Sequence, residues 1–257
     1  MGRVRIISIT NQKGGVGKTT TAINLSACLA EADKKVLVID ADPQGNTTSG
    51  LGLEKNEVEN TVYDLMLGEK QIKDVIYDTC VKGLYIIPSN INLSGAEIEL
   101  IGQERREHIL DSALKDIKKN YDFILIDCPP SLNLITINAL TASDTVLVPI
   151  QCEYFALEGL EQLMYTISLV KKRLNSRLSL EGVVFTMYDA RTNLSMEVVE
   201  EVKQELKSNI YKTIIPRNVR LGEAPSHGLP ITMYDNRSKG AESYRLLAEE
   251  VIEKEWS

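Results

Sequence analysis

The stretch Lys13–Thr20 (KGGVGKTT) directly follows an apolar run, Val4–Thr10 (VRIISIT). Small and flexible residues in such a stretch let successive backbone N–H groups turn inward and bind phosphate oxygens. Lys18 would reach the β- and γ-phosphates of a nucleotide, and the Thr19 hydroxyl can ligand Mg²⁺. The strict pattern G-x-x-x-x-G-K-S/T fails because Gln12 stands where its first glycine belongs. The sequence therefore predicts a phosphate-binding loop of the variant form K-G-G-x-G-K-T, whose contact residues are Gly14, Gly15, Val16, Gly17, Lys18, Thr19 and Thr20.

The chain around this loop alternates between strand-like and helix-like segments. A βαβ unit is expected from Val4–Thr10, an apolar stretch after Lys18, and Lys35–Asp40 (KVLVID), with the loop at its first turn. Further strands are predicted at Leu84–Pro88, Phe123–Asp127, Thr145–Ile150, Leu180–Met187 and Tyr211–Ile215, and helices at Ala96–Lys119, Leu157–Leu174, Met196–Ser208 and Ala241–Lys254. This alternation predicts an α/β fold, a doubly wound and mostly parallel sheet with helices on both faces. We expect residues 1–257 to form a single domain.

The composition limits the classes of function. The 257 residues carry a net charge of −7, which argues against a globally basic nucleic-acid binder but not against a local basic patch. The four cysteines (Cys28, Cys80, Cys128 and Cys152) form no C-x-x-C pair, so we expect buried, reduced thiols of a cytoplasmic protein, with neither disulfides nor a cysteine-ligated metal. The N-terminus carries no signal segment, and no apolar run approaches ~18 residues, so no membrane insertion is expected.

Three aspartates complete the predicted site. Asp127 ends the apolar strand FILID and is expected to hold Mg²⁺ directly or through water. Asp40 ends the second predicted strand, so it emerges at the same carboxyl edge of the sheet, near the metal. Asp42 lies further out, where it could orient or deprotonate an attacking water, and Gly45 would let this loop move. Each aspartate alone could be a turn or N-cap residue, but together with the loop they favour a nucleotide site with Mg²⁺.

The loop resembles that of the deviant Walker A ATPases, and longer stretches narrow the resemblance. DADPQGNTTSGLG, IDCPPSLNLITINAL, PIQCEYFALEGL, MYDARTNL and IPRNVRLGEAPSHGLPI are similar to the ParA/Soj chromosome- and plasmid-partitioning ATPases, especially the short Soj type, over nearly the whole chain. The resemblance implies a P-loop NTPase domain, ATP and Mg²⁺ as cofactors, and an ATP-bound sandwich homodimer that hydrolyses ATP. It also implies non-specific binding to double-stranded DNA, stimulation by a ParB-like protein, and a cytoplasmic, nucleoid-associated location.

The same resemblance assigns roles to individual residues. Lys13 matches the signature lysine that crosses the dimer interface to the partner's nucleotide, and Gly14 matches the glycine whose small size permits two subunits to approach. Asp42 matches the residue that activates water, while Pro216 and Asn218 match the segment that lines the adenine. The expected catalytic residues are therefore Lys13, Lys18 and Asp42, and the expected metal-site residues are Thr19, Asp40 and Asp127.

Arg191 and Arg220 are the candidate DNA contacts. Arg191 lies in a polar turn (DARTN), Arg217 and Arg220 follow the last predicted strand, and Lys239 is a weaker candidate. Residue chemistry alone favours ordinary solvated arginines, whereas the resemblance matches Arg191 and Arg220 to positions implicated in DNA binding. No segment resembles a base-reading helix, so binding is expected to use phosphates and to be salt-sensitive.

Two other interpretations stay open. A MinD-like membrane-associated cell-division regulator shares the ATPase core, but it needs a C-terminal amphipathic helix with a basic polar face. Here the end of the chain, ESYRLLAEEVIEKEWS, is acidic, which opposes docking on anionic lipid. Its apolar residues Leu246, Leu247, Val251 and Ile252 are expected to pack on the domain. A metabolic P-loop enzyme would require substrate residues or cysteine ligands beyond the nucleotide site.

Overall fold

An eight-stranded sheet forms the centre of the computed structural model, which describes residues 4–153, 156–206 and 208–254. The strands lie in the order β3-β4-β2-β5-β1-β6-β7-β8, and every neighbouring pair is parallel except β3 and β4. Their bounds are β1 Arg5–Ile9, β2 Val36–Asp40, β3 Tyr77–Asp78, β4 Leu84–Ile87, β5 Phe123–Asp127, β6 Thr145–Gln151, β7 Ser179–Tyr188 and β8 Ile210–Pro216. The central strands are buried along their whole length, as expected where helices cover both faces of a parallel sheet.

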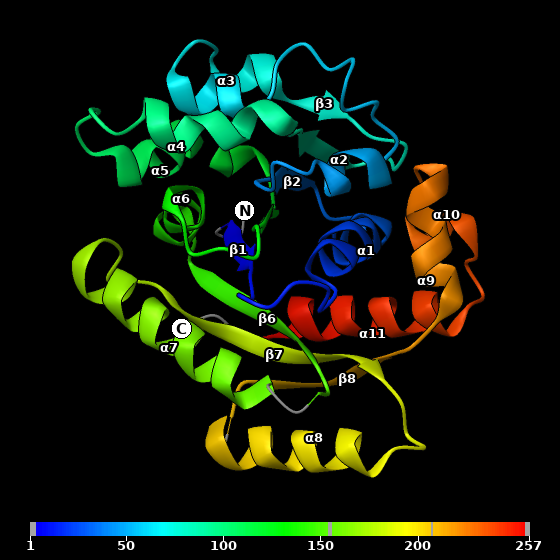
Figure 1. Cartoon of the computed structure of the whole chain (residues 1–257). Helices are drawn as coiled ribbons and strands as arrows, with labels where there is room; N and C mark the ends of the chain where they lie inside the picture. The colour runs from blue at the N-terminus through cyan, green and yellow to red at the C-terminus, as the bar shows by residue number, and fades with distance from the viewer. Residues whose placement is uncertain (1–3, 154–155, 207, 255–257) are drawn as a thin grey trace.

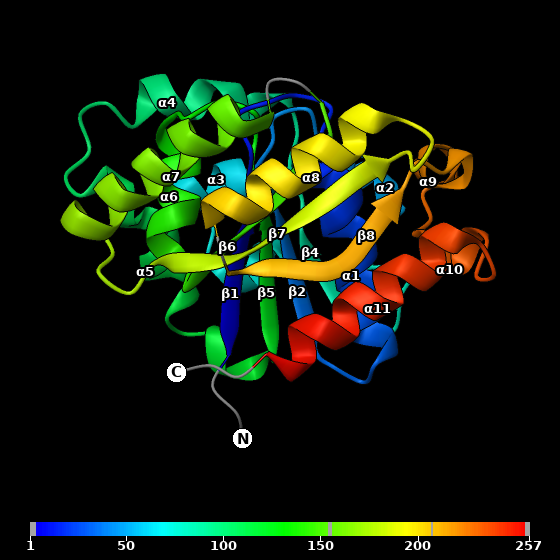
Figure 2. The same cartoon turned by 90° about the horizontal axis from the view of Figure 1, so that it is seen from below.

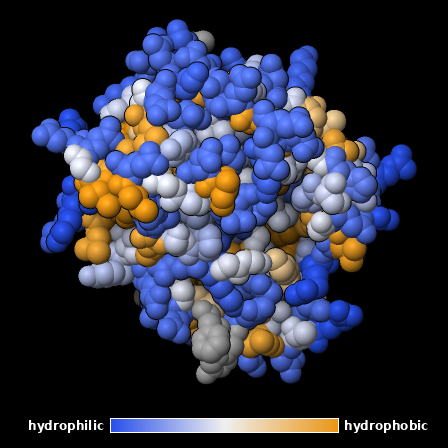
Figure 3. Space-filling view, turned by 45° about the horizontal axis from the view of Figure 1, so that its top comes forward, coloured by the Kyte–Doolittle hydropathy of each residue, from blue (hydrophilic) through white to orange (hydrophobic). Residues whose placement is uncertain are grey.

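Helices pack on both faces of the sheet, so the predicted doubly wound α/β fold is confirmed (Figure 1). The helices are α1 Lys18–Glu31, α2 Asn46–Gly50, α3 Val62–Leu67, α4 Ala96–Glu99, α5 Ile109–Leu114, α6 Leu134–Ala142, α7 Ala156–Arg173, α8 Asn193–Leu206, α9 Val219–Glu223, α10 Ile231–Tyr234 and α11 Lys239–Glu253. One apolar core joins α1 and α11 to the sheet, and two further cores lie under α3–α6 and under α7 and α8. The face of the molecule in Figure 3 is largely hydrophilic, with its largest apolar patch at the left and smaller apolar groups elsewhere.

The predicted helix Ala96–Lys119 is wrong as a single element. The structure breaks this stretch into α4, α5 and short 3₁₀ turns at Arg106–His108 and Lys118–Asn120. Arg105 adopts a φ of 56°, in the left-handed region that a continuous α-helix of L-residues cannot accommodate. The break lets Leu100 and Leu110 enter the same core from separate segments. The structure also contains β3, α2, α3, α6, α9 and α10, which the sequence pattern did not predict.

The C-terminal helix α11 packs on the domain, as predicted, but only through part of its apolar set. Leu247 and Val251 are fully buried, and Ile252 packs partly buried against the core. Leu246 is 47% exposed, so the expectation that it packs inward is wrong. The expectation of buried thiols also fails at one position, because Cys80 is exposed while the other three cysteines are buried.

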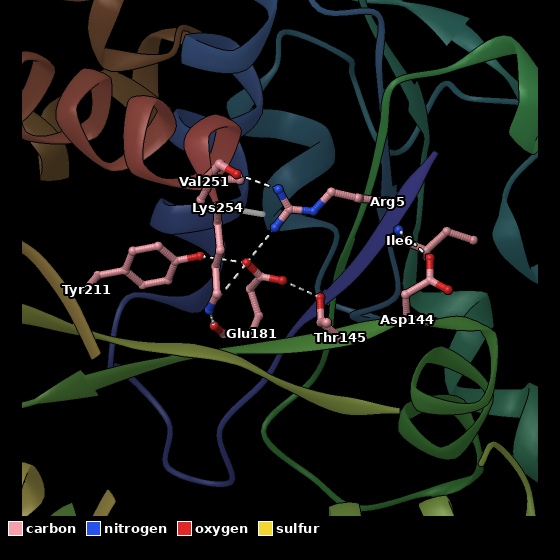
Figure 4. Close-up of polar contacts among 8 residues, drawn as sticks. All are labelled: Arg5, Ile6, Asp144, Thr145, Glu181, Tyr211, Val251 and Lys254. Carbon is pink, nitrogen blue, oxygen red and sulfur yellow. Dashed lines mark hydrogen bonds and ion pairs between the residues drawn. The ribbon is translucent and has the colours of Figure 1, made fainter. Parts of the chain in front are cut away.

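A buried polar cluster ties α11 to the amino ends of the strands, at the edge opposite the phosphate-binding loop (Figure 4). The Glu181 carboxylate pairs with Arg5 at 2.6 Å and accepts hydrogen bonds from Thr145 at 2.6 Å and Tyr211 at 2.8 Å. Arg5 also donates to the backbone carbonyl of Val251. The cluster therefore fixes the end of α11 against β1, β6, β7 and β8.

Candidate functional site

The phosphate-binding loop joins β1 to α1 and depends on two glycines with left-handed backbones. Gly15 has a φ of 74°, and Gly17, the N-cap of α1, has a φ of 86°. Only glycine adopts these conformations without strain, which explains their places in the motif. Strand β7 also holds the loop, because the buried Thr186 hydroxyl of β7 donates to the Val16 carbonyl at 2.8 Å. The loop therefore stands preformed at the N-terminus of α1, where backbone N–H groups attract anions.

Lys18 lies inside this loop as a nearly buried cation. It is 7% exposed, and its Nζ donates to the backbone carbonyl of Lys13 at 2.9 Å. Burial lowers the pKa of Lys18, and the nearby charge of Asp127 opposes that shift. A polyphosphate in the loop would supply the negative charge that a buried ammonium group requires.

Asp127 and Asp40 lie side by side at the ends of β5 and β2. One oxygen of Asp127, Oδ2, accepts hydrogen bonds from Thr19 at 2.9 Å and from Thr47 at 2.7 Å. Its other oxygen, Oδ1, is buried and has no hydrogen-bond partner among the described residues. Burial, and then the charge of Asp40, raise the pKa of Asp127. A divalent cation fits this place, because it would ligand the bare oxygen and the Thr19 hydroxyl and would neutralise the buried pair.

The structure gives Asp40 a different set of contacts from those of Asp127. Its Oδ2 accepts from the backbone N–H of Thr48 at 2.8 Å and from the Thr48 hydroxyl at 2.7 Å, and its Oδ1 accepts from the Asp42 N–H at 3.1 Å. Asp40 therefore holds the loop that carries Asp42 and lies beside Asp127, with both of its oxygens already hydrogen-bonded. No group of three or more acidic, histidine or cysteine side chains gathers around a metal position in the described ranges.

Asp42 stands in a tight turn between β2 and α2. Its Oδ1 accepts from the Gln44 N–H at 2.9 Å, and Gly45 follows with a φ of 61° as the N-cap of α2. Lys55 donates to the Gln44 carbonyl at 2.7 Å and so closes the turn from outside. Sequence reasoning missed this lysine, and it also missed Thr47, Thr48 and Thr186. The threonines at 47 and 48 follow Asp42 in the DADPQGNTT stretch, whereas Lys55 and Thr186 carry no motif signal.

The Lys13 side chain pairs with a carboxylate outside its own loop. Its Nζ pairs with Glu153 at 2.5 Å, and Gln151 holds the other oxygen of the same carboxylate at 2.5 Å. The Lys13 side chain is 36% exposed. Next to it, a Cβ built on Gly14 would meet no atom within 4 Å. Lys13 and Gly14 therefore lie on an open surface at the rim of the site.

A cavity of about 480 Å³ opens beside the loop. Its lining includes Gly17 and Thr20 from the loop, together with Pro216 and Asn218, so the structure unites residues nearly 200 positions apart. Asn218 is the N-cap of α9 and accepts from the Arg220 N–H at 2.9 Å. The walls are mostly apolar, which suits a planar base, and the phosphate loop at one end orients such a ligand.

The two candidate DNA-binding arginines lie beyond the carboxyl ends of β7 and β8. Tyr188 at the end of β7 pairs with Pro216 at the end of β8, and the two arrowheads lie next to one another near α9 in Figure 2. Arg191 and Arg220 follow these strand ends within a few residues, and both are exposed. They therefore belong to the same edge of the sheet as the nucleotide cavity.

The variant loop, the strand order and the paired strand-end aspartates are those of a P-loop ATPase of the deviant Walker A class. A family model described as an AAA domain matches residues 4–180. The chain is 61% identical over 247 residues to the sporulation initiation inhibitor protein Soj of Bacillus subtilis. That match spans 96% of this chain and 98% of the Soj protein. It is 51% identical over 251 residues to the chromosome partitioning protein ParA of Myxococcus xanthus. That match spans 98% of this chain and 89% of the ParA protein. The chain therefore belongs to the Soj/ParA family of chromosome-partitioning ATPases.

Solved structures show the same fold. A cobyrinic acid a,c-diamide synthase from Mycobacterium smegmatis, solved with bound ADP and magnesium, is similar with a TM-score of 0.86 and 36% identity, covering 97% of this chain and 94% of that one. No helix within the described ranges is long and apolar enough to cross a membrane.

Proposed function

We propose that this protein is an ATP-switched partitioning ATPase. In this proposal ATP drives a sandwich dimer, the dimer binds double-stranded DNA without sequence preference, and a ParB-like partner stimulates hydrolysis during chromosome or plasmid segregation. The observation that carries the proposal is the second lysine of the loop. Lys18 Nζ lies inside the loop and donates to the Lys13 carbonyl, while Lys13 Nζ pairs with Glu153 at the open rim.

Different residues of the chain bind the phosphates, the base and the metal ion of Mg²⁺-ATP. Lys18 and the backbone amides of the loop bind the phosphates, and the cavity with Pro216 and Asn218 takes the base. Thr19 and Asp127 hold Mg²⁺, with Asp40 beside them, and the ion when bound supplies positive charge to the phosphates. Two findings support this assignment: the bare buried oxygen of Asp127, and the ADP and magnesium in the related synthase structure.

Hydrolysis requires a group that aligns water with the terminal phosphate. Asp42 is the proposed group, since it stands at the carboxyl edge of the sheet in a turn held by Asp40 and Lys55. Lys13 of each subunit would cross to the partner's phosphates and complete the site in trans. This role requires Lys13 to leave Glu153, an exchange of one partly exposed ion pair for another.

The alternative of a MinD-like membrane-associated regulator is less well supported. Such a helix must present an apolar face to lipid. In α11, Leu247 and Val251 are fully buried against the domain, and the polar face carries Glu242, Glu249 and Glu253. An acidic helix whose apolar residues are buried against the domain, apart from the half-exposed Leu246, would bind an anionic bilayer weakly.

Retention on DNA-cellulose tests the proposal directly. Wild-type protein is applied with ATP, with ADP and without nucleotide, and Lys13→Ala is run in parallel. We expect retention of the wild type only with ATP, and no retention of Lys13→Ala, which should still bind ATP but stay monomeric in light scattering. Equal retention in all three nucleotide conditions, or an ATP dimer of Lys13→Ala, would contradict the switch.

A further inference from the structure

Three arginines lie at the β7–β8 edge, and they differ in whether their guanidinium groups pair with a carboxylate. Arg191 donates to Asp189 through two nitrogens, at 2.8 and 2.6 Å. Arg220 pairs with Glu223 at 2.8 Å and lies 3.7 Å from Asp235. Both guanidinium groups face solvent, with side-chain exposures of 87% and 54%. Each therefore meets an approaching phosphate with a carboxylate already hydrogen-bonded to its guanidinium group.

Arg217, at the same β7–β8 edge, differs from both in having no carboxylate partner among the described residues. It is the first residue after β8, and its backbone N–H donates to the Tyr188 carbonyl at the end of β7 at 3.2 Å. Its exposed guanidinium group makes no hydrogen bond or ion pair with any residue that the structure describes. Tyr188 directly precedes Asp189, so this backbone hydrogen bond holds Arg217 beside the segment that carries the Asp189–Arg191 pair.

We propose that Asp189 and Glu223 restrain DNA binding by holding Arg191 and Arg220, and that Arg217 is a further phosphate contact at the same edge. This inference rests on the proposed DNA-binding function and concerns how that function is limited. A phosphate that takes over the hydrogen bonds of Arg191 and Arg220 displaces a carboxylate from each, and that carboxylate then lies near the phosphate and repels it. Arg217 needs no such exchange.

The size of the restraint follows from counterion release. Each phosphate neutralised contributes about 0.9 to the slope of log affinity against log salt, which corresponds to roughly fivefold in affinity at 0.15 M salt. A two-fold symmetric dimer carries every substitution twice. Releasing one arginine per subunit should therefore tighten DNA binding by roughly 30-fold and steepen the slope by about 2.

Conservative amide variants remove the negative charge and keep the local hydrogen bonds. Asp189 Oδ1 accepts from the Arg191 backbone N–H at 3.0 Å, and the carbonyl oxygen of Asp189→Asn can accept the same bond. Glu223 accepts from the Tyr234 hydroxyl at 3.2 Å, as the Glu223→Gln carbonyl oxygen can. Glu31→Gln is the matched control, because Glu31 pairs with Arg245 at 2.7 and 3.0 Å at the far end of α1. It makes the same charge change away from the β7–β8 edge.

The experiment is a salt series of DNA titrations at saturating ATP, with bound nucleotide measured for each variant because Glu223 lines the nucleotide cavity. We expect tighter binding and a steeper salt slope for Asp189→Asn and Glu223→Gln than for Glu31→Gln, and weaker binding for Arg217→Ala. If the wild type binds DNA with ATP but the two amide variants match Glu31→Gln, the restraint is wrong and the proposed function stands. If Arg217→Ala binds like the wild type, the extra contact is wrong. If neither the wild type nor any variant binds DNA with ATP, the proposed function itself fails.

Discussion

Gly14 provides the sharpest test of the dimer, because its surroundings in the monomer are empty. A Cβ at this position meets no atom within 4 Å, and its φ lies outside the left-handed region. Replacing it should leave the monomer as stable as before, or raise its melting temperature by up to roughly 4 °C through the lost entropy of the unfolded chain. In a symmetric dimer that brings the two loops together, the added bulk is present twice. Overpacking costs roughly 1–3 kcal/mol at each copy, so Gly14→Val should weaken the ATP dimer by roughly 30-fold or more.

The neighbouring glycine supplies the control. Gly15 has a φ of 74°, so Gly15→Val forces a left-handed valine, which costs roughly 1–2 kcal/mol and lowers the melting temperature by roughly 2–8 °C. We expect Gly15→Val to lose ATP binding, and Gly14→Val to bind ATP and remain monomeric. Thermal melts, fluorescent-nucleotide titration and light scattering with ATP measure the three properties. Normal ATP dimers of Gly14→Val would refute the close approach, and loss of its ATP binding would mean that Gly14 acts within its own loop.

Three further substitutions probe other parts of the molecule. Asp42→Ala should lower phosphate release by roughly 100-fold or more while ATP binding persists, and undiminished release would contradict its role with water. Asp127→Asn should weaken nucleotide binding by roughly tenfold or more with Mg²⁺ present but not in EDTA, whereas equal losses in both would point to a folding defect. Glu181→Ala removes the solvent-inaccessible carboxylate that pairs with Arg5. It should lower the free energy of unfolding measured in urea by about 3–5 kcal/mol, because the buried Arg5 then lacks that carboxylate. Burial alone would raise the pKa of Glu181, but Arg5 and two hydrogen bonds lower it below the ordinary 4.5, so the wild-type advantage should vanish as the pH falls through that lowered pKa. An unchanged urea midpoint at neutral pH would contradict the clamp.

Features that depend on neighbouring residues could be predicted from the amino-acid sequence. Lys13–Thr20 specified a phosphate-binding loop, because Gly15 and Gly17 are needed for backbone conformations that no other residue adopts cheaply. The apolar runs specified the strands of the sheet, since continuous β-branched segments suit burial on both faces. Asp40 and Asp127 could be paired in advance because parallel strands end at one edge of the sheet, and the structure aligns them as neighbours.

The contacts that these residues make with distant segments could not be predicted, because they depend on how the whole chain packs. Ala96–Lys119 has the apolar pattern of a helix, yet packing of Leu100 and Leu110 into one core requires a break between them. The hydroxyl of Thr186 reaches the loop across 170 positions, and no short-range pattern encodes such a contact. The sequence predicted Arg191 and Arg220 as DNA contacts but not the carboxylates that pair with them. Such an ion pair depends on side-chain placement at the surface and leaves no periodic pattern in the sequence. Neighbouring residues determine local conformation, whereas contacts between distant segments follow from how the whole chain packs.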